Sequence, residues 1–141
     1  DLLVESCDAQ LLFNYNPKQE KEAIEIVEKC KPKTRNNSRL EIFGTNLREF
    51  LALTSHCGAL IGNEGGAVNM AKALDIPTFS IFSPQIEKKV WAVYQDELNV
   101  AVHVEDFIKE DIKTSERNYE NFKPEYFFPQ LKVFLEKVRA K

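Results

Sequence analysis

Hydrophobic and polar positions along this chain of 141 residues have two different periodicities, and each change of periodicity marks a boundary between secondary-structure elements. Short apolar or β-branched runs of strand length are followed by segments whose apolar residues recur every three to four positions, as on one face of a helix. The predicted strands lie at residues 10–15, 39–43, 59–62, 78–82 and 99–104. Strands that alternate with helices predict an α/β fold, a Rossmann-like three-layer domain with a mostly parallel sheet.

The same periodicity, with capping and breaking residues, predicts the helices. Residues 1–9 are typical of the tail of a helix whose beginning is missing, and further helices are predicted at residues 18–30, 47–56, 67–74, 87–94 and 129–140. Residues 31–38 are polar and favour a loop, and residues 106–121 are charged and favour irregular or weakly helical structure. Apolar residues at i, i+4, i+7 and i+11 from Phe127 form a stripe that must pack on another element. Trp91 is interpreted as a partly buried packing residue rather than a platform for a base.

The most informative stretch, residues 57–84, reads CGALIGNEGGAVNMAKALDIPTFSIFSP. An apolar run of strand length stops at residues 63–66, which have turn chemistry, and a helix follows. The predicted apolar stripe of this helix consists of Ala67, Met70, Ala71 and Leu74. Asp75 and Pro77 end the helix before a second apolar run. This strand, helix and strand with a very short first connection have the format of a parallel crossover.

The first connection of this crossover is the candidate ligand site. In open α/β sheets, ligands bind beyond the carboxyl ends of the strands, where a helix begins with unpaired N–H groups. Gly65 and Gly66 would leave these partly positive amides open to an anionic oxygen. The amide of Asn69 would point to the same space, whereas the Glu64 carboxylate would repel a phosphate and suits sugar hydroxyls or a helix cap. A tight turn without a ligand is the alternative.

Composition excludes several function classes. The chain is 29% charged and 43% hydrophobic, which is ordinary for a folded domain, and its length suits one domain. A net charge of -3 without a basic stripe argues against nucleic acid as a partner. No apolar run has the length that crosses a bilayer, and the lack of a signal peptide carries little weight because the sequence begins at Asp1 without a methionine. The expected location is cytoplasmic, from the pattern of the cysteines.

The cysteines and histidines indicate no metal or redox chemistry. Cys7, Cys30 and Cys57 lie far apart without a C-x-x-C pair, which is typical of reduced thiols in a cytosolic protein. His56 and His103 have no partner at metal-ligand spacing. We therefore predict no metal site, no histidine-based triad and no cofactor.

Residues 47–84 resemble a known family. The run LREFLALTSHCGALIGNEGGAVNMAKALDIPTFSIFSP is similar to the carboxyl-terminal half of bacterial heptosyltransferases, glycosyltransferase family nine, which have the two-domain GT-B fold. Members typically show a leucine-rich helix, an apolar strand, an N-D-[ST]-G-x-x-H segment, an alanine-rich helix and a proline-led strand. The resemblance covers residues 10–84, and the remainder agrees only in its order of elements.

The resemblance implies a domain that binds a nucleotide diphosphate sugar, usually ADP-heptose, with the pyrophosphate at the helix start. Glu64 stands where the family has aspartate, Gly65 where it has serine or threonine, Gly66 on its glycine and Asn69 on its histidine. Phosphate contacts would come chiefly from the backbone amides of Gly65, Gly66 and Ala67.

Other positions matched by the resemblance complete the expected site. The turn at Gly44 and Thr45 corresponds to a loop beside the adenine, and residues 16–20 lie near the ribose side. The changes at Gly65 and Asn69 remove two hydrogen-bond donors that would hold the diphosphate. Each hydrogen bond to a charged group contributes about 1.5 to 3 kcal/mol. The alternatives are therefore a branch of the family that uses another sugar donor, or a degenerate noncatalytic α/β module for protein association.

We expect residues 1–141 to form a single donor-binding domain, truncated at its first strand and first helix, with the amino-terminal acceptor domain absent. The family's catalytic base belongs to that acceptor domain, so no catalytic residue is assigned and binding without transfer is expected. The full-length enzyme would act in lipopolysaccharide or related glycan synthesis, with peripheral contact with the inner membrane.

Overall fold

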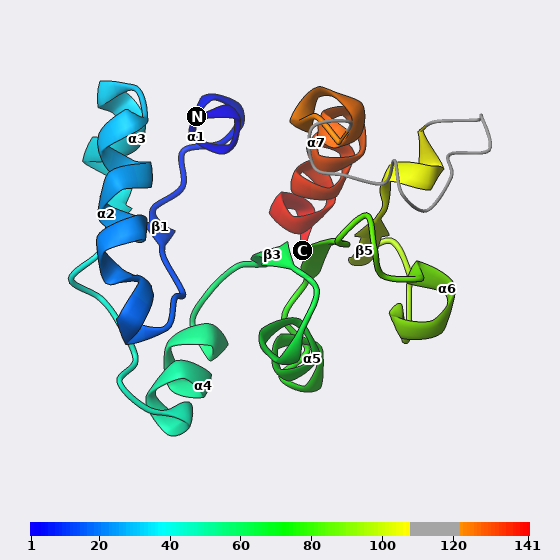
Figure 1. Ribbon diagram of the computed structural model, residues 1–141, viewed down its shortest axis with the longest axis horizontal. Helices are drawn as coiled ribbons and strands as arrows, with labels where there is room; N and C mark the ends of the chain where they lie inside the picture. The colour runs from blue at the N-terminus through cyan, green and yellow to red at the C-terminus, as the bar shows by residue number, and fades with distance from the viewer. Residues whose placement is uncertain (108–121) are drawn as a thin grey trace. The chain divides into compact units, whose positions relative to one another are not determined.

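The computed structural model describes residues 1–107 and 122–141 (Figure 1). Backbone contacts divide the chain into two compact units, Asp1–Leu53 and Thr54–Lys141, and each is described by itself. Every strand pair in the described residues is parallel, and helices separate successive strands in the sequence. The predicted fold class, a Rossmann-like α/β fold, is thereby confirmed. The prediction for residues 106–121 falls, from residue 108 onward, outside the described residues.

The amino-terminal unit consists of short elements around a two-stranded sheet. Its elements are α1 (Leu2–Ser6), β1 (Leu11–Leu12), η1 (Pro17–Gln19), α2 (Glu20–Lys29), α3 (Pro32–Asn37) and β2 (Ser38–Arg39), and α4 (Leu47–Ser55) follows. The strands pair with Leu11 opposite Ser38. Val4, Ala23, Val27 and Thr34 are its buried side chains among those described.

The prediction of a loop at residues 31–38 is wrong, because α3 occupies most of it. Pro32 lies in the first turn of this helix, where its missing N–H removes no hydrogen bond and its fixed φ favours the helix. The hydroxyl of Thr34 donates to Asp1 Oδ1 at 2.7 Å, which ties α3 to the start of α1. A contact between residues so far apart in the sequence could not be seen in the local pattern.

The strands predicted at residues 10–15 and 39–43 are confirmed only in part, since β1 and β2 have two residues each. Beyond the paired residues, the two segments are joined by side chains. The rings of Tyr15 and Phe43 stack with their centroids 4.7 Å apart. The apolar residues that suggested longer strands therefore pack without a backbone ladder.

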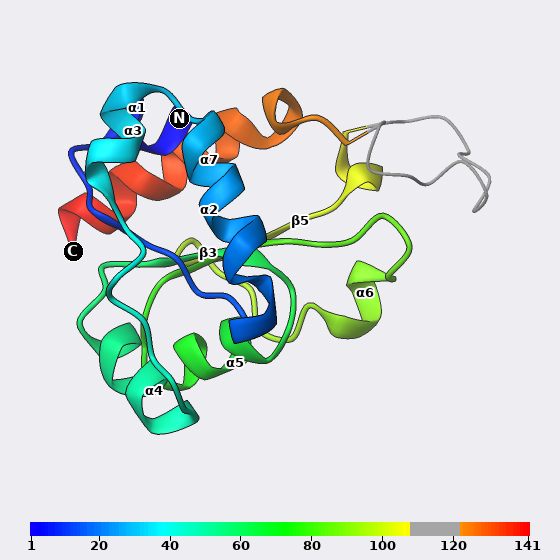
Figure 2. The same ribbon diagram turned by 60° about the vertical axis from the view of Figure 1, so that its left-hand side comes forward.

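The carboxyl-terminal unit is built on a three-stranded parallel sheet of order β3-β4-β5. Its strands are β3 (Leu60–Asn63), β4 (Thr78–Ile81) and β5 (Asn99–Val102), and its helices are α5 (Gly66–Ala73), α6 (Lys88–Trp91), η2 (Val104–Asp106) and α7 (Pro124–Ala140). Helices α5 and α7 lie on opposite faces of this sheet (Figure 2). The crossover predicted from residues 57–84 is confirmed as β3, α5 and β4.

The core of this unit centres on Phe79, which is fully buried. Its ring centroid lies 6.1 Å from that of Phe127 and 5.6 Å from that of Phe134, both on α7. Neighbouring side chains of a strand point to opposite faces, so Thr78 and Ser80 face the α5 side. The apolar stripe predicted on the last helix is confirmed, since Phe127, Leu131 and Phe134 are buried.

Helix α7 begins at Pro124, so the predicted start at Pro129 is wrong. Pro124 takes the favoured first-turn position, and Pro129 lies inside the helix. An interior proline removes a backbone hydrogen bond and destabilises a helix by about 3 kcal/mol. The packing of Phe127 and Phe134 on the sheet offsets this loss, because burying aromatic side chains is among the largest apolar contributions.

The buried face of α5 also differs from the prediction. Val68 and Ala71 are buried, whereas Leu74 is 37% exposed because the helix ends at Ala73 and Leu74 is its C-cap. The face that meets the sheet is therefore rotated from the predicted stripe. Among residues 1–107 and 122–141, no helix combines the length and apolar character that crossing a bilayer requires.

Candidate functional site

A cavity of about 470 Å³ lies in the carboxyl-terminal unit, where β3 gives way to α5. One wall is the start of α5, a second is β4 with its extension to Phe82, and a third is the segment from Ile86 to Ala92. The volume is in the range of small-molecule sites, about 300 to 1,000 Å³. All of the lining residues belong to Thr54–Lys141, so this unit forms the cavity alone.

The bend between β3 and α5 depends on glycine. Gly65 has φ +150°, which side chains rarely adopt, and its carbonyl accepts a hydrogen bond from Asn69 N at 3.3 Å. A Cβ on Gly65 would meet no atom within 4 Å, and one on Gly66 would meet only Met70 Cε at 4.0 Å. The bend is therefore open rather than filled by neighbouring atoms.

The first turn of α5 presents free backbone donors at this bend. Within the described residues, the N–H groups of Gly66, Ala67 and Val68 make no hydrogen bond, as expected for the first turn of a helix. They carry the positive end of the helix dipole. The combination of open space and unpaired donors is suited to an anionic oxygen.

Glu64 lines the cavity but does not cap α5, so that alternative from the sequence is excluded. Its Oε2 accepts a long hydrogen bond of 3.4 Å from Ser83 N, and its own N–H donates to Ile81 O at 3.2 Å. The side chain is half-buried. A carboxylate with one long contact still has capacity to accept hydrogen bonds from hydroxyl groups.

Lys72 lines the same cavity and was missed by sequence reasoning. Its Nζ donates to Val93 O and Tyr94 O, both at 2.8 Å. Burial lowers the pKa of this ammonium below its ordinary value of 10.5, an effect that the nearby Asp96 carboxylate opposes. The signal was the spacing of Gly66, Asn69 and Lys72 at i, i+3 and i+6, which places all three on one side of the helix.

Trp91 also lines the cavity, and its side chain is 66% exposed. The interpretation as a partly buried packing residue is therefore wrong. Helix α6 has only four residues, and in Figure 1 it stands beside the sheet rather than on its buried faces. No element of this unit covers the indole within the described residues, because α6 lies at the edge of the layers.

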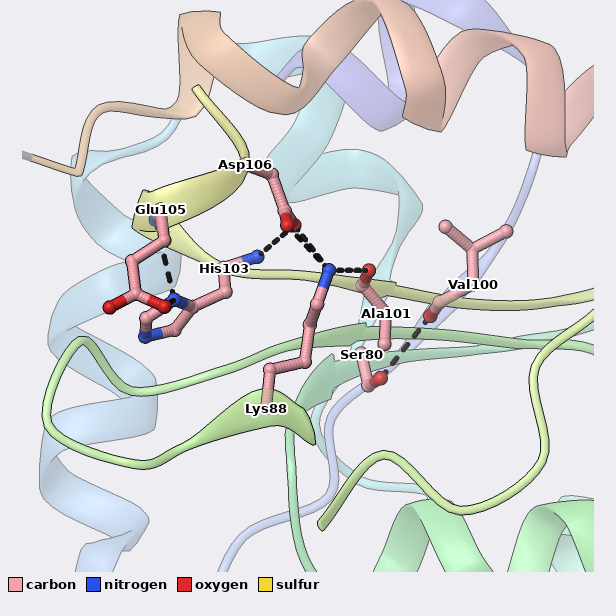
Figure 3. A network of polar contacts seen from close by, with 7 residues as sticks. All are labelled: Ser80, Lys88, Val100, Ala101, His103, Glu105 and Asp106. Atoms are coloured by element: carbon pink, nitrogen blue, oxygen red, sulfur yellow. Dashed lines mark hydrogen bonds and ion pairs between the residues drawn. The ribbon is translucent and has the colours of Figure 1, made fainter. Parts of the chain in front are cut away.

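A polar network fixes α6 to the end of β5 (Figure 3). Lys88 Nζ donates to both carboxylate oxygens of Asp106 at 2.6 Å and to Ala101 O at 3.4 Å. Asp106 Oδ2 also accepts from His103 N at 2.8 Å. The Lys88 and Asp106 side chains are 22% and 29% exposed, so solvent screens this pair less than a fully exposed ion pair.

His103 belongs to this network rather than to the cavity. It is fully buried, and its Nδ1 accepts from Glu105 N at 3.3 Å, which caps η2. Its Nε2 has no hydrogen-bond partner in the described part of the chain. No group of three or more histidine, cysteine or acidic side chains there is placed to hold a metal ion.

The structure brings most, but not all, of the predicted site residues together. Those that line the cavity are Glu64, Gly65, Gly66 and Asn69. Ala67 contributes its N–H to the first turn of α5 without lining the cavity. Thr45 lies in the other unit, where its N–H and hydroxyl both donate to Glu49 Oε2 at 2.8 Å. A role for Thr45 beside a base therefore stays a prediction.

A parallel α/β sheet with an open glycine bend and free helix amides beyond a strand end places this unit in the class of Rossmann-like α/β domains. The chain matches the family model of glycosyltransferase family 9 (heptosyltransferase) over residues 4–120, and it belongs to this family. The resemblance stated from residues 10–84 is thereby confirmed over a longer stretch. Searches of curated proteins and of solved structures returned no match.

Proposed function

We propose that the chain is the donor-binding domain of a glycosyltransferase, a single domain over residues 1–141 that binds a nucleotide diphosphate sugar resembling ADP-heptose. The observation that carries this proposal is the open bend at Gly65 and Gly66, where the first turn of α5 has three unpaired amides and borders a cavity of about 470 Å³. Membership of the family supports sugar transfer as the reaction of the full-length enzyme.

The proposed roles follow from the chemistry of each group. The amides of Gly66, Ala67 and Val68 hold oxygens of the diphosphate. Asn69 donates a neutral hydrogen bond there, and Lys72 supplies the positive charge that Asn69 cannot carry. The family's histidine at position 69 is thus functionally replaced by a lysine on the same side of α5. Glu64 accepts hydroxyl hydrogens of a sugar.

The full-length enzyme in this proposal includes an amino-terminal acceptor domain that supplies the catalytic base. Sugar transfer requires the donor and the acceptor to be held in a reactive orientation, so this chain alone binds the sugar donor without transferring the sugar. The enzyme acts in lipopolysaccharide or related glycan synthesis, in the cytoplasm and at the inner membrane face.

Isothermal titration calorimetry with ADP, an ADP-sugar and a UDP-sugar tests the proposal. The decisive variants are Gly66→Asp and its uncharged match Gly66→Asn, because a side chain at this position has open space. The aspartate repels the diphosphate from the amides, and we expect affinity to fall at least 10-fold, since charged hydrogen bonds contribute ~1.5 to 3 kcal/mol each. The asparagine should lower affinity less. Indifference of the folded protein to every nucleotide would refute the proposal.

A noncatalytic module for protein association is the second candidate, favoured by one observation. Four large side chains around α6 are exposed, namely Val90, Trp91, Val93 and Tyr94. Light scattering over a range of protein concentrations distinguishes the candidates, because association through such an apolar surface raises the apparent mass. A constant monomeric mass together with nucleotide binding would leave only the first candidate.

A further inference from the structure

The further inference rests on the proposed function and concerns the ring of the ligand rather than its phosphates. We propose that the Trp91 indole is a stacking platform for a ring of the bound nucleotide sugar, either the base or the sugar. Stacking on an exposed indole selects a ligand that carries such a ring, so Trp91 is a specificity-determining residue of the site. The departure of positions 65 and 69 from the family pattern leaves other groups to hold the donor.

Trp91 is placed to contact whatever occupies the cavity. Trp91, Ile86 and Ala92 form one apolar wall, and the amides of α5 and the Lys72 ammonium belong to another. A ligand that rests its diphosphate on the amides has its attached ring in the same cavity. The indole is 66% exposed, so its face is available to that ring.

Two lysines hold the segment that carries Trp91. On its amino-terminal side, Lys88 binds Asp106 and Ala101 O at the end of β5 (Figure 3). On its carboxyl-terminal side, Lys72 binds the carbonyls of Val93 and Tyr94 from α5. The indole is therefore carried by a segment whose backbone is fixed at both ends, and a pre-organised segment loses less conformational entropy when a ligand binds.

Neighbouring apolar side chains allow a matched control. Val93 is as exposed as Trp91, at 68%, but it does not line the cavity. If exposed apolar surface alone mattered, truncation of Val93 and of Trp91 would have similar effects. If a ring contact matters, only Trp91 affects binding.

The experiment uses the sole tryptophan of the chain as its own probe. ADP-glucose should change the Trp91 fluorescence on binding, and ADP should do so if the stacked ring is the base, whereas inorganic pyrophosphate should not. By calorimetry, Trp91→Ala should weaken nucleotide binding about 5- to 150-fold, the range measured for aromatic stacking on a base, and leave pyrophosphate affinity unchanged. Trp91→Phe should retain most of the affinity, and Val93→Ala should match the wild type.

The ligands distinguish the two rings and the two proposals. A loss with ADP-glucose alone assigns the stacked ring to the sugar, and an equal loss with ADP assigns it to the base. Unchanged affinity of Trp91→Ala for both ADP and ADP-glucose would overturn the inference and leave the proposed function standing. An equal loss for pyrophosphate would also overturn it, because Trp91 would then act on the shape of the site. Failure of every ligand to bind the wild type would overturn both proposals.

Discussion

The two compact units of this chain are stabilised by different interactions. In Thr54–Lys141, the strands have four residues, and the fully buried Phe79 of β4 packs against aromatic rings of α7. In Asp1–Leu53, the strands have two residues, and polar contacts join the short elements, such as Thr34 to Asp1 and Lys31 to Glu5, with the Lys31 ion pair at 2.6 Å.

The difference explains where a binding site can form. Exposed ion pairs contribute about 0 to 1 kcal/mol each, whereas one fully buried large apolar side chain contributes about 1.5 to 3 kcal/mol. The cavity lies wholly in the unit with the apolar core. A site that must hold its shape before the ligand arrives requires such support.

Removal of the Phe79 ring should lower the free energy of unfolding more than the other substitutions proposed for this chain. Phe79→Ala leaves a cavity between β4 and α7, and we expect a loss of about 3 to 5 kcal/mol in the free energy of unfolding of this unit. Hydrogen exchange of the β4 amides measures it, with Val133→Ala on the exposed side of α7 as control. Val27→Ala in the other unit should lose less, about 1 to 3 kcal/mol. Equal losses at both sites would contradict the comparison.

A substitution at the bend between β3 and α5 should lower the free energy of unfolding by less, and through backbone strain rather than a lost side chain. Gly65→Ala meets no neighbouring atom, so its loss arises from φ +150° alone, and we expect about 1 to 3 kcal/mol. Gly58→Ala is the matched control, because a Cβ there also meets nothing and no positive φ opposes it. Urea unfolding followed by circular dichroism measures both variants. The same midpoint for both would show that the bend carries no strain.

The polar contacts of the amino-terminal unit should contribute less per residue. Thr34→Val removes the hydrogen bond to Asp1 at almost unchanged volume, and we expect a loss of about 1 kcal/mol. Thr34→Ser keeps the hydroxyl and separates the hydrogen bond from the packing of the methyl group. Hydrogen exchange in α3 measures the result, and a loss larger than that of Gly65→Ala would reverse the proposed ranking.

The smallest expected effect is a pH dependence at the start of α4. A hydrogen bond from Thr45 N, joined by one from the Thr45 hydroxyl, lowers the pKa of Glu49 below its ordinary value of 4.5. Because the folded pKa lies below the unfolded one, this contribution is present above the unfolded value and is lost as pH falls through the folded value.

The variant that tests this dependence is Glu49→Gln. Its melting temperature should fall less than that of the wild type between neutral pH and about pH 3, since the variant has no carboxylate to protonate. Glu41→Gln, at an exposed glutamate without a hydrogen bond in the described residues, is the control. A wild type and Glu49→Gln with parallel pH profiles would rule out the contribution.

The crossover and most of the candidate site could be predicted from the sequence because their signals are local. Gly65 and Gly66 interrupt the apolar run, and the strand at residues 78–82 follows a helix stop, so the backbone preferences of adjacent residues define β3, α5 and β4. Glu64 and Asn69 were found because their spacing from the glycines is fixed by the turn and the helix. The family was recognised from this same stretch.

Burial and long-range contacts decided what could not be predicted. Only the packing of α7 on Phe79 shows that Pro129 is tolerated inside a helix, and only the place of α6 beside the sheet shows that Trp91 is exposed. Lys72 became a candidate site residue only from the structure, in which it lines the same cavity as Trp91. Local preferences extend over a few residues, whereas burial depends on segments that are distant in the sequence and meet only in the folded chain.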